Sequence, residues 1–130
     1  MKTSDLTGAA LDWAVAKCEG IELESGYGVQ ETSGYYNRLL VDGRMSKGQS
    51  MLVRYIPSTD WAQGGKLIER EGIQLRCGLG GWVALPYDSE FSEEAYQEGD
   101  TPLVAAMRVY VASKMGLEVN IPEGLTGVAT

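Results

Sequence analysis

The segment Thr101–Gly116 restricts the fold of this chain more than any other part of it. Thr101 is a natural N-cap, Pro102 stands at the first helical position, where its missing N–H costs nothing, and Gly116 ends the helix. A helix that is apolar over so broad a face packs flat on a sheet, so a sheet is expected elsewhere in the chain. The apolar positions are Leu103, Val104, Ala106, Met107, Tyr110, Val111 and Met115.

A second helix is predicted near the amino end. Apolar residues recur at helical spacing from Leu6 to Cys18. Ser4 is the expected N-cap and Thr7 the alternative, while Gly20 supplies the stop.

A third helix is predicted in the middle of the chain. It begins at Ser58 or Asp60, because either side chain can accept from the free backbone amides of a first turn. It runs to about Arg70 and ends at Gly72.

Four segments have the pattern of strands. Ile21–Glu24 alternates apolar and polar residues, and Met51–Ile56 is a clearer strand. Ile73–Cys77 and Trp82–Pro86 are expected to form a β-hairpin around the turn Gly78–Gly81. These strands lie between the helices in the order expected of a mixed fold.

Together these elements predict an α+β fold, a compact sandwich of a mainly antiparallel sheet of about five strands covered by three helices. The irregular, glycine-rich segment Ser25–Ser50 is expected to add one or two short strands, and the acidic segment Tyr87–Gly99 to form a solvated loop. A chain of 130 residues predicts one domain, here over residues 1–121, with a frayed tail over residues 122–130.

Composition excludes several functions. The chain has no histidine, which removes a histidine-based triad, a histidine zinc site and an imidazole general base. Its 18 acidic and 11 basic side chains give a net charge of −7, which argues against direct binding of nucleic acid. We therefore predict no metal and no cofactor, and favour a non-catalytic role while leaving turnover open.

The thiols and the amino end indicate the compartment. Cys18 and Cys77 are too few for a disulfide scaffold and are expected as buried thiols in a reducing cytosol. Met1–Asp5 opens no signal-peptide pattern, and no apolar stretch approaches the ~18 residues that a membrane span requires. We expect a cytoplasmic protein that binds no membrane.

The start of the middle helix is the first candidate site. A strand that runs into a capped helix directs unpaired amides and a positive dipole end at one spot, which suits phosphate or carboxylate. Two glycines inside a helix, Gly64 and Gly65, each cost about 1 kcal/mol relative to alanine. Either a ligand or the close approach of another backbone is expected to compensate. The candidate ligand-binding residues here are Ser58, Thr59, Asp60, Trp61, Gln63 and Gly64.

The second candidate site joins Thr101 to Arg108. An arginine beside the apolar face of a helix needs an anionic partner, which is Asp60, Asp12 or a ligand. Of these, a structural ion pair is favoured. A third candidate is the aromatic segment Gly26–Gly28 with Tyr35–Arg38, which can stack on a base or hold a protein partner.

Several blocks of this sequence resemble one known family. Leu6–Ala16, Pro57–Gly65, Ile68–Ile73, Trp82–Ala84 and Thr101–Arg108 resemble the NinX-like family of small phage and prophage proteins. The helix starts are also similar, more weakly, to phage α-β-α sandwich domains. The resemblance implies a viral origin and a setting in the host cytoplasm. It brings no catalytic residues with it.

Two functions from different classes follow from the site and this setting. In the first, the protein sequesters a small anionic ligand, such as a nucleotide immune signal, as a counter-defence. Ser58, Thr59 and Thr101 would hold phosphate, Arg108 would neutralise it, and Trp61 or Trp13 would stack the base. A homo-oligomer suits this function, since pockets often form between subunits.

In the second function, the acidic segment Asp88–Asp100 inhibits a host defence protein or a DNA-binding protein, either by imitating nucleic acid or by filling a basic groove. An enzyme that acts on nucleotides is the third and least favoured alternative. The segment Tyr35–Ser50 does not align with the family pattern, and the sequence assigns it no role.

Overall fold

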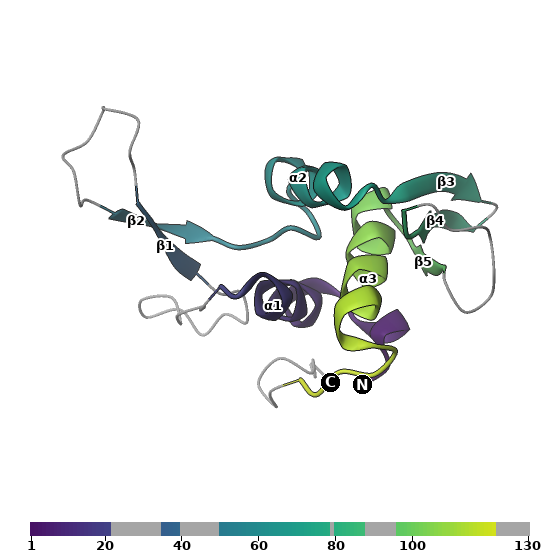
Figure 1. Cartoon of the computed structure of the whole chain (residues 1–130), viewed down its shortest axis with the longest axis horizontal. Coiled ribbons are helices and arrows are strands. Elements are labelled where there is room, and N and C mark those ends of the chain that lie inside the picture. Colours follow the sequence, from purple (N-terminus) through teal and green to yellow (C-terminus); the bar gives the residue numbers. More distant parts are fainter. Residues whose placement is uncertain (22–34, 40–49, 79, 88–95, 122–130) are drawn as a thin grey trace.

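The computed structural model describes residues 1–21, 35–39, 50–78, 80–87 and 96–121, shown as coloured ribbon in Figure 1. These ranges contain a short 3-10 helix, three α-helices and five strands. In chain order the elements are η1 (Thr3–Asp5), α1 (Gly8–Glu19), β1 (Tyr35–Leu39), β2 (Ser50–Arg54), α2 (Trp61–Glu71), β3 (Gln74–Gly78), β4 (Gly81–Leu85), β5 (Gln97–Gly99) and α3 (Pro102–Met115).

Helix α3 lies at the centre of the fold. It stands between α1 on one side and the strands β3–β5 on the other, with α2 near its upper end in Figure 1. The predicted broad apolar face is confirmed except at Met115, which is exposed, and Val104 is only partly buried. Because neighbours cover more than one side of α3, its burial exceeds that of a helix laid on a sheet alone. The buried residues of α3 are Leu103, Ala105, Ala106, Met107, Val109, Tyr110 and Val111.

The strands form two antiparallel sheets. β3, β4 and β5 make one, in that order, and β1 and β2 make a separate pair. The mixed α+β class is confirmed, but a single sheet of about five strands covered by three helices is not. α3 makes the main helix contact with the three-stranded sheet, while α1 and α2 pack on α3.

Strand β5 lies where a solvated loop was expected, so that prediction is wrong for Gln97–Gly99. Its three residues carry no apolar alternation from which a strand could be predicted. They are held by tertiary contacts instead. Gly99 approaches α3 so closely that a Cβ there would lie 2.5 Å from the Ala105 nitrogen. Gln97 pairs with Ala84 of β4 and is buried.

The helix boundaries follow the predicted caps closely. Asp60, and not Ser58, caps α2 by accepting a hydrogen bond from the Ala62 amide at 2.9 Å. Thr101 caps α3 by accepting from the Val104 amide at 3.1 Å. The first-choice cap of α1 was wrong: Thr7 occupies that position, because η1 takes up the residues before it.

The first residues of the chain pair with the segment that follows α3. The Thr3 amide donates to the Leu117 carbonyl at 2.8 Å, and the Val119 amide donates to the Met1 carbonyl at 2.9 Å. The buried Thr3 hydroxyl donates to the Gly116 carbonyl at 2.7 Å, where α3 ends. These bonds place the two segments side by side beneath the sheet.

A polar cluster joins the three helices. Arg70 of α2 donates two hydrogen bonds to the Glu19 carboxylate of α1, at 2.9 and 2.6 Å, and Tyr110 of α3 donates to the same carboxylate. The Arg70 guanidinium, together with the Tyr110 hydroxyl, holds the pKa of Glu19 below its usual range. Because Arg70 is half exposed, solvent screens this pair, and the cluster sets the helix arrangement more than it adds stability.

The thiols differ from the prediction in part. Cys77 is exposed on β3, so its expected burial is wrong, and Cys18 is half-buried at the end of α1. Burial raises the pKa of Cys18 to about 11. In the described part of the chain, no helix is both long and apolar enough to cross a membrane.

Other expectations lie outside the described residues. These are the strand Ile21–Glu24 beyond Ile21, most of Ser25–Ser50, residues 88–95 of the acidic segment and the tail over residues 122–130. The extent of the domain over residues 1–121 stays a prediction.

The two glycines of α2 give the first prediction, because their surroundings differ. A Cβ on Gly64 would overlap the Pro57 carbonyl oxygen and lie 2.7 Å from Leu103 Cδ2, whereas one on Gly65 would lie 3.6 Å from the Trp61 ring. Gly64→Ala should lower the unfolding free energy by about 1–3 kcal/mol through overpacking. Gly65→Ala should raise it by about 1 kcal/mol through helix propensity. Urea unfolding of both variants is the measurement, and a Gly64→Ala variant as stable as the parent would contradict this packing.

Candidate functional site

The backbone amides at the start of α2 are largely used by the chain itself. The Ser58 amide donates to the buried Asp12 carboxylate at 2.9 Å, and the Ile56 amide donates to the Gln63 side-chain oxygen at 2.6 Å. The Thr59 and Asp60 amides both donate to the Ile56 carbonyl. Few donors therefore remain at this turn for a bound anion.

The Gly64 position has a packing explanation. Its α-carbon lies against the Pro57 carbonyl and the Leu103 side chain, which leaves no room for a Cβ. Of the two explanations offered for this glycine, the close approach of another part of the chain is the one that the structure contains.

The side chains predicted around α2 lie in unlike surroundings. Ser58 is 1% exposed, and its hydroxyl has no hydrogen-bond partner among the described residues. Trp61 is 55% exposed, and Thr59 is exposed with its hydroxyl 3.4 Å from the Ile56 carbonyl oxygen. Trp13 is half-buried on α1, with the Lys17 ammonium 5.4 Å from its ring centroid.

Arg108 is held by the main chain. Its Nε donates to the Leu6 carbonyl at 2.9 Å and its Nη1 to the Glu98 carbonyl at 2.6 Å. The favoured ion pair with Asp60 or Asp12 is not formed. Burial lowers the pKa of the half-buried guanidinium, against the opposing effect of the Asp100 and Asp5 carboxylates. An arginine stays charged through such a shift, so a cation sits here without a bonded carboxylate among the described residues.

Two clefts meet at this arginine. The first, which we name the hairpin cleft, has a volume of about 230 Å³. The second, the edge cleft, has a volume of about 540 Å³ and lies between β5 and the two paired chain segments. Residues lining the hairpin cleft include Gly78, Gly80, Gly81, Trp82, Asp100 and Arg108. Those lining the edge cleft include Lys2, Ser4, Tyr96, Gln97, Arg108 and Glu118.

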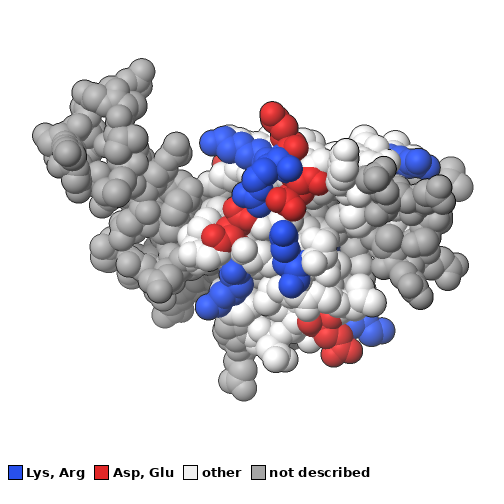
Figure 2. Space-filling view, viewed as in Figure 1, with Lys and Arg blue, Asp and Glu red and all other residues white. Residues whose placement is uncertain are grey.

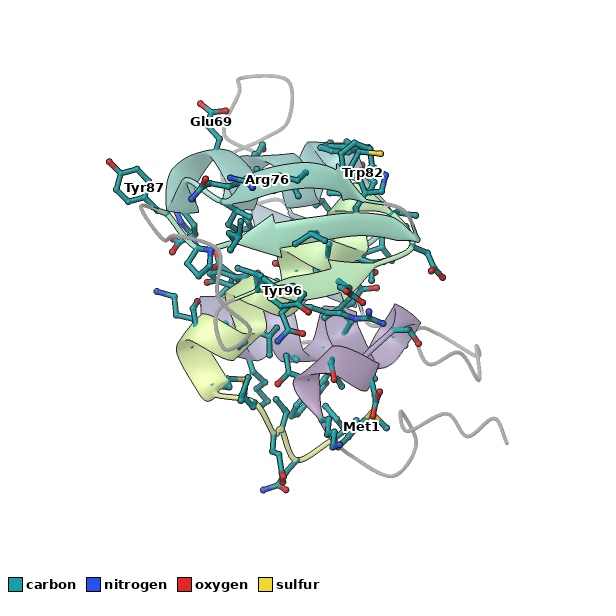
Figure 3. All side chains as sticks on the ribbon, turned by 90° about the vertical axis from the view of Figure 1, so that its right-hand side faces the viewer. Met1, Glu69, Arg76, Trp82, Tyr87 and Tyr96 are labelled. Carbon is teal, nitrogen blue, oxygen red and sulfur yellow. The ribbon has the colours of Figure 1, made fainter. Side chains whose placement is uncertain are left out.

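Figure 3 shows where one labelled residue of each cleft lies, Trp82 for the hairpin cleft and Tyr96 for the edge cleft. Trp82 stands at one end of the three-stranded sheet, and Tyr96 lies where β5 faces the amino-terminal elements. Arg76 lies on β3, the strand farthest from β5 in the sheet. Arg108 and Glu98 line both clefts, so a single guanidinium serves both.

The structure therefore brings together a different set from the predicted one. Of the nine predicted ligand-binding residues, Arg108 alone lines either of these two clefts, and Thr101 directly follows Asp100 of the hairpin cleft. Gln97 and Tyr96 were missed because they lay in a segment expected to be a loop. A ligand-binding role for the other predicted residues stays a prediction.

The two remaining candidates, the aromatic segment and the acidic segment, lie only partly in the residues that the structure describes. Tyr35–Arg38 lies on β1, while Gly26–Gly28 falls outside the described residues. Residues 88–95, the larger part of the acidic segment, also fall outside them. Figure 2 shows basic and acidic side chains interleaved on one face. Arg70 forms ion pairs with Glu19 and Glu71, and Lys114 forms one with Glu71. Within the described ranges, no group of three or more Cys, Asp or Glu side chains is arranged to hold a metal ion.

Ser58 gives the second prediction. Because its buried hydroxyl is unpartnered, Ser58→Ala should leave the unfolding free energy unchanged or raise it by up to about 1 kcal/mol. Thr59→Ala, which removes an exposed hydroxyl, is the matched control and should change stability little. Denaturant unfolding measures both, and a loss above about 1 kcal/mol for Ser58→Ala would reveal a partner for the hydroxyl.

Comparison with protein families identifies a match. A family model described as bacteriophage P22 NinX matches residues 2–114. The match spans Tyr35–Ser50, a segment that the resemblance seen in the sequence did not cover. It also includes Arg108 and all but the last residue of α3. No curated protein matches the chain.

Proposed function

This chain belongs to the bacteriophage NinX family, and on that premise we propose that it is a non-catalytic phage accessory protein that binds and sequesters a small anionic ligand. The observation that carries the proposal is Arg108, a half-buried cation bonded only to carbonyl oxygens in the described part of the chain. It lies on the wall of both clefts, where a ligand can reach it.

The guanidinium has donors to spare. Of the five N–H groups that an arginine carries, the Leu6 and Glu98 carbonyls each take one. The carbonyl bonds fix the plane and direction of the group without neutralising it. A preorganised, charged donor beside a cleft favours an anion, because hydrogen bonds between charged partners are roughly twice as strong as those between neutral ones.

The ligand class that best fits this site is a nucleotide. Trp82 in the hairpin cleft and Tyr96 in the edge cleft are both half-buried, and either offers an aromatic face near the arginine. A nucleotide combines a flat base with an anionic phosphate, the two features that such a pair recognises. In a host cytoplasm, removal of a nucleotide immune signal would act as a counter-defence. The absence of histidine suits binding without turnover.

Arg108 gives the third prediction. In a thermal-shift screen against linear and cyclic nucleotides, a true ligand present at about 100 times its Kd should stabilise the protein by roughly 2.7 kcal/mol. Arg108→Gln should weaken that ligand at least tenfold in calorimetry. Arg76→Gln removes the same charge from an exposed position on β3 and should leave the affinity unchanged.

Two outcomes would contradict the proposal. One is a screen in which no nucleotide or other small anion stabilises the parent protein. The other is a folded Arg108→Gln variant that binds as tightly as the parent. Arg108 also donates to the Leu6 and Glu98 carbonyls, so its replacement can weaken the fold as well as the binding. Arg108→Lys keeps the charge, and its comparison with Arg108→Gln separates the effect of the charge on binding from the effect of these hydrogen bonds on the fold.

A further inference from the structure

The edge cleft contains an unsatisfied polar group. Gln97 is 7% exposed, and its side-chain oxygen is buried with no hydrogen-bond partner among the described residues. A buried acceptor without a donor costs free energy, so native proteins seldom keep one without a reason. Gln97 also lines the cleft, so its amide can turn toward a molecule bound there.

The place of Gln97 in the fold explains why the group is held there. Its neighbour Glu98 accepts the Arg108 hydrogen bond, and its partner across the sheet is Ala84, which is fully buried. The backbone at Gln97 is thus held by its pairing with β4 and by the hydrogen bond from Arg108 to the adjacent Glu98 carbonyl. A half-turn of the amide about its Cγ–Cδ bond exchanges the places of its oxygen and nitrogen, since the two are alike in shape, and can bring the unpartnered oxygen to the cleft.

The charges of the edge cleft limit what can bind. Lys2 and Arg108 are opposed by Glu98 and Glu118, so among the described residues its lining has as many carboxylates as cations. A ligand with one negative charge can use Arg108 without meeting a large excess of carboxylate. A polyanion such as a triphosphate would place its further charges beside the two glutamates, which are exposed at the rim, and those charges would gain nothing from the cleft.

Size distinguishes the two clefts. Pockets for small molecules usually measure about 300–1,000 Å³, a range that the edge cleft falls within and the hairpin cleft does not reach. Two glycines of the hairpin cleft are also explained by packing. A Cβ on Gly81 would lie 2.6 Å from the Gly99 carbonyl oxygen, and Gly99 itself lies against α3.

We propose that the edge cleft binds a small monoanion that carries an N–H or O–H donor, with its anionic group on Arg108 and its donor on the Gln97 amide oxygen. This inference rests on the proposed function and narrows it to one cleft and one ligand charge. Gln97 is the residue that selects for the donor, and the glutamates at the rim select against further negative charge.

Cyclic GMP and GTP are the probes, because they share a base with N–H donors and differ in charge. Acetate serves as a monoanion without a donor. Calorimetry should show saturable binding of cyclic GMP, at least tenfold tighter than that of GTP, and no measurable binding of acetate. Gln97→Leu should weaken cyclic GMP at least tenfold while its melting temperature equals or exceeds that of the parent, because the variant removes an unpaired buried group.

Gln74→Leu is the matched control. Gln74 lies on β3 outside both clefts and donates to the Pro86 carbonyl at 3.1 Å. This variant should lose stability and keep its affinity for cyclic GMP, the reverse of Gln97→Leu.

The outcomes separate this inference from the function on which it rests. If Arg108→Gln abolishes cyclic GMP binding but Gln97→Leu does not weaken it, the assignment of the edge cleft is overturned and the anion site at Arg108 stands. GTP binding as tight as that of cyclic GMP would overturn the selection for a single charge. Failure of cyclic GMP to bind at all would overturn the inference, while stabilisation by another small anion in the screen would leave the proposed function intact.

Discussion

Burial of α3 is the constraint on which the rest of this structure depends. Its apolar residues cannot be covered by one neighbour, so α1, α2 and the three-stranded sheet each pack on a different part of it (Figure 1). Close packing then sets the local sequence. Gly64 of α2 and Gly99 of β5 lie against α3, and a Cβ at either position would come within 2.7 Å of an atom of α3. These two glycines are therefore required by the close packing around the central helix.

The same constraint explains the position of Arg108. A long charged side chain near the middle of an enclosed helix must reach an edge of the packing, and Arg108 does so between η1 and β5. Two carbonyl oxygens satisfy part of its hydrogen-bonding capacity, while its charge has no bonded counterpart in the part of the chain that the structure describes. The group that fastens β5 to the helix is therefore also the group to which we assign the anion in our proposal.

The helices were predictable from sequence, because caps and stops are local signals. The start of α3 is marked by Thr101 and Pro102. The two ends of α2 are marked by Asp60 and Gly72. The short strand β5 was not predictable, since it forms through contacts with α3 and not through its own pattern. The clefts beside Arg108 are formed in part by β5, so most of the candidate site could not be predicted from the sequence either. The sequence predicts a carboxylate or a ligand as the partner of Arg108, whereas the fold supplies two main-chain carbonyls.

The most direct test of the account is the NMR signal of the Arg108 Nε–H group during a titration with cyclic GMP. The account predicts a saturable shift of this signal and of the Gln97 side-chain amide, with the Arg70 and Arg76 signals unmoved. Arg70 is engaged by Glu19, and Arg76 lies on the far strand of the sheet. Equal shifts at all three arginines would indicate unspecific attraction of an anion. An unmoved Arg108 signal in the presence of a bound anion would contradict the central claim.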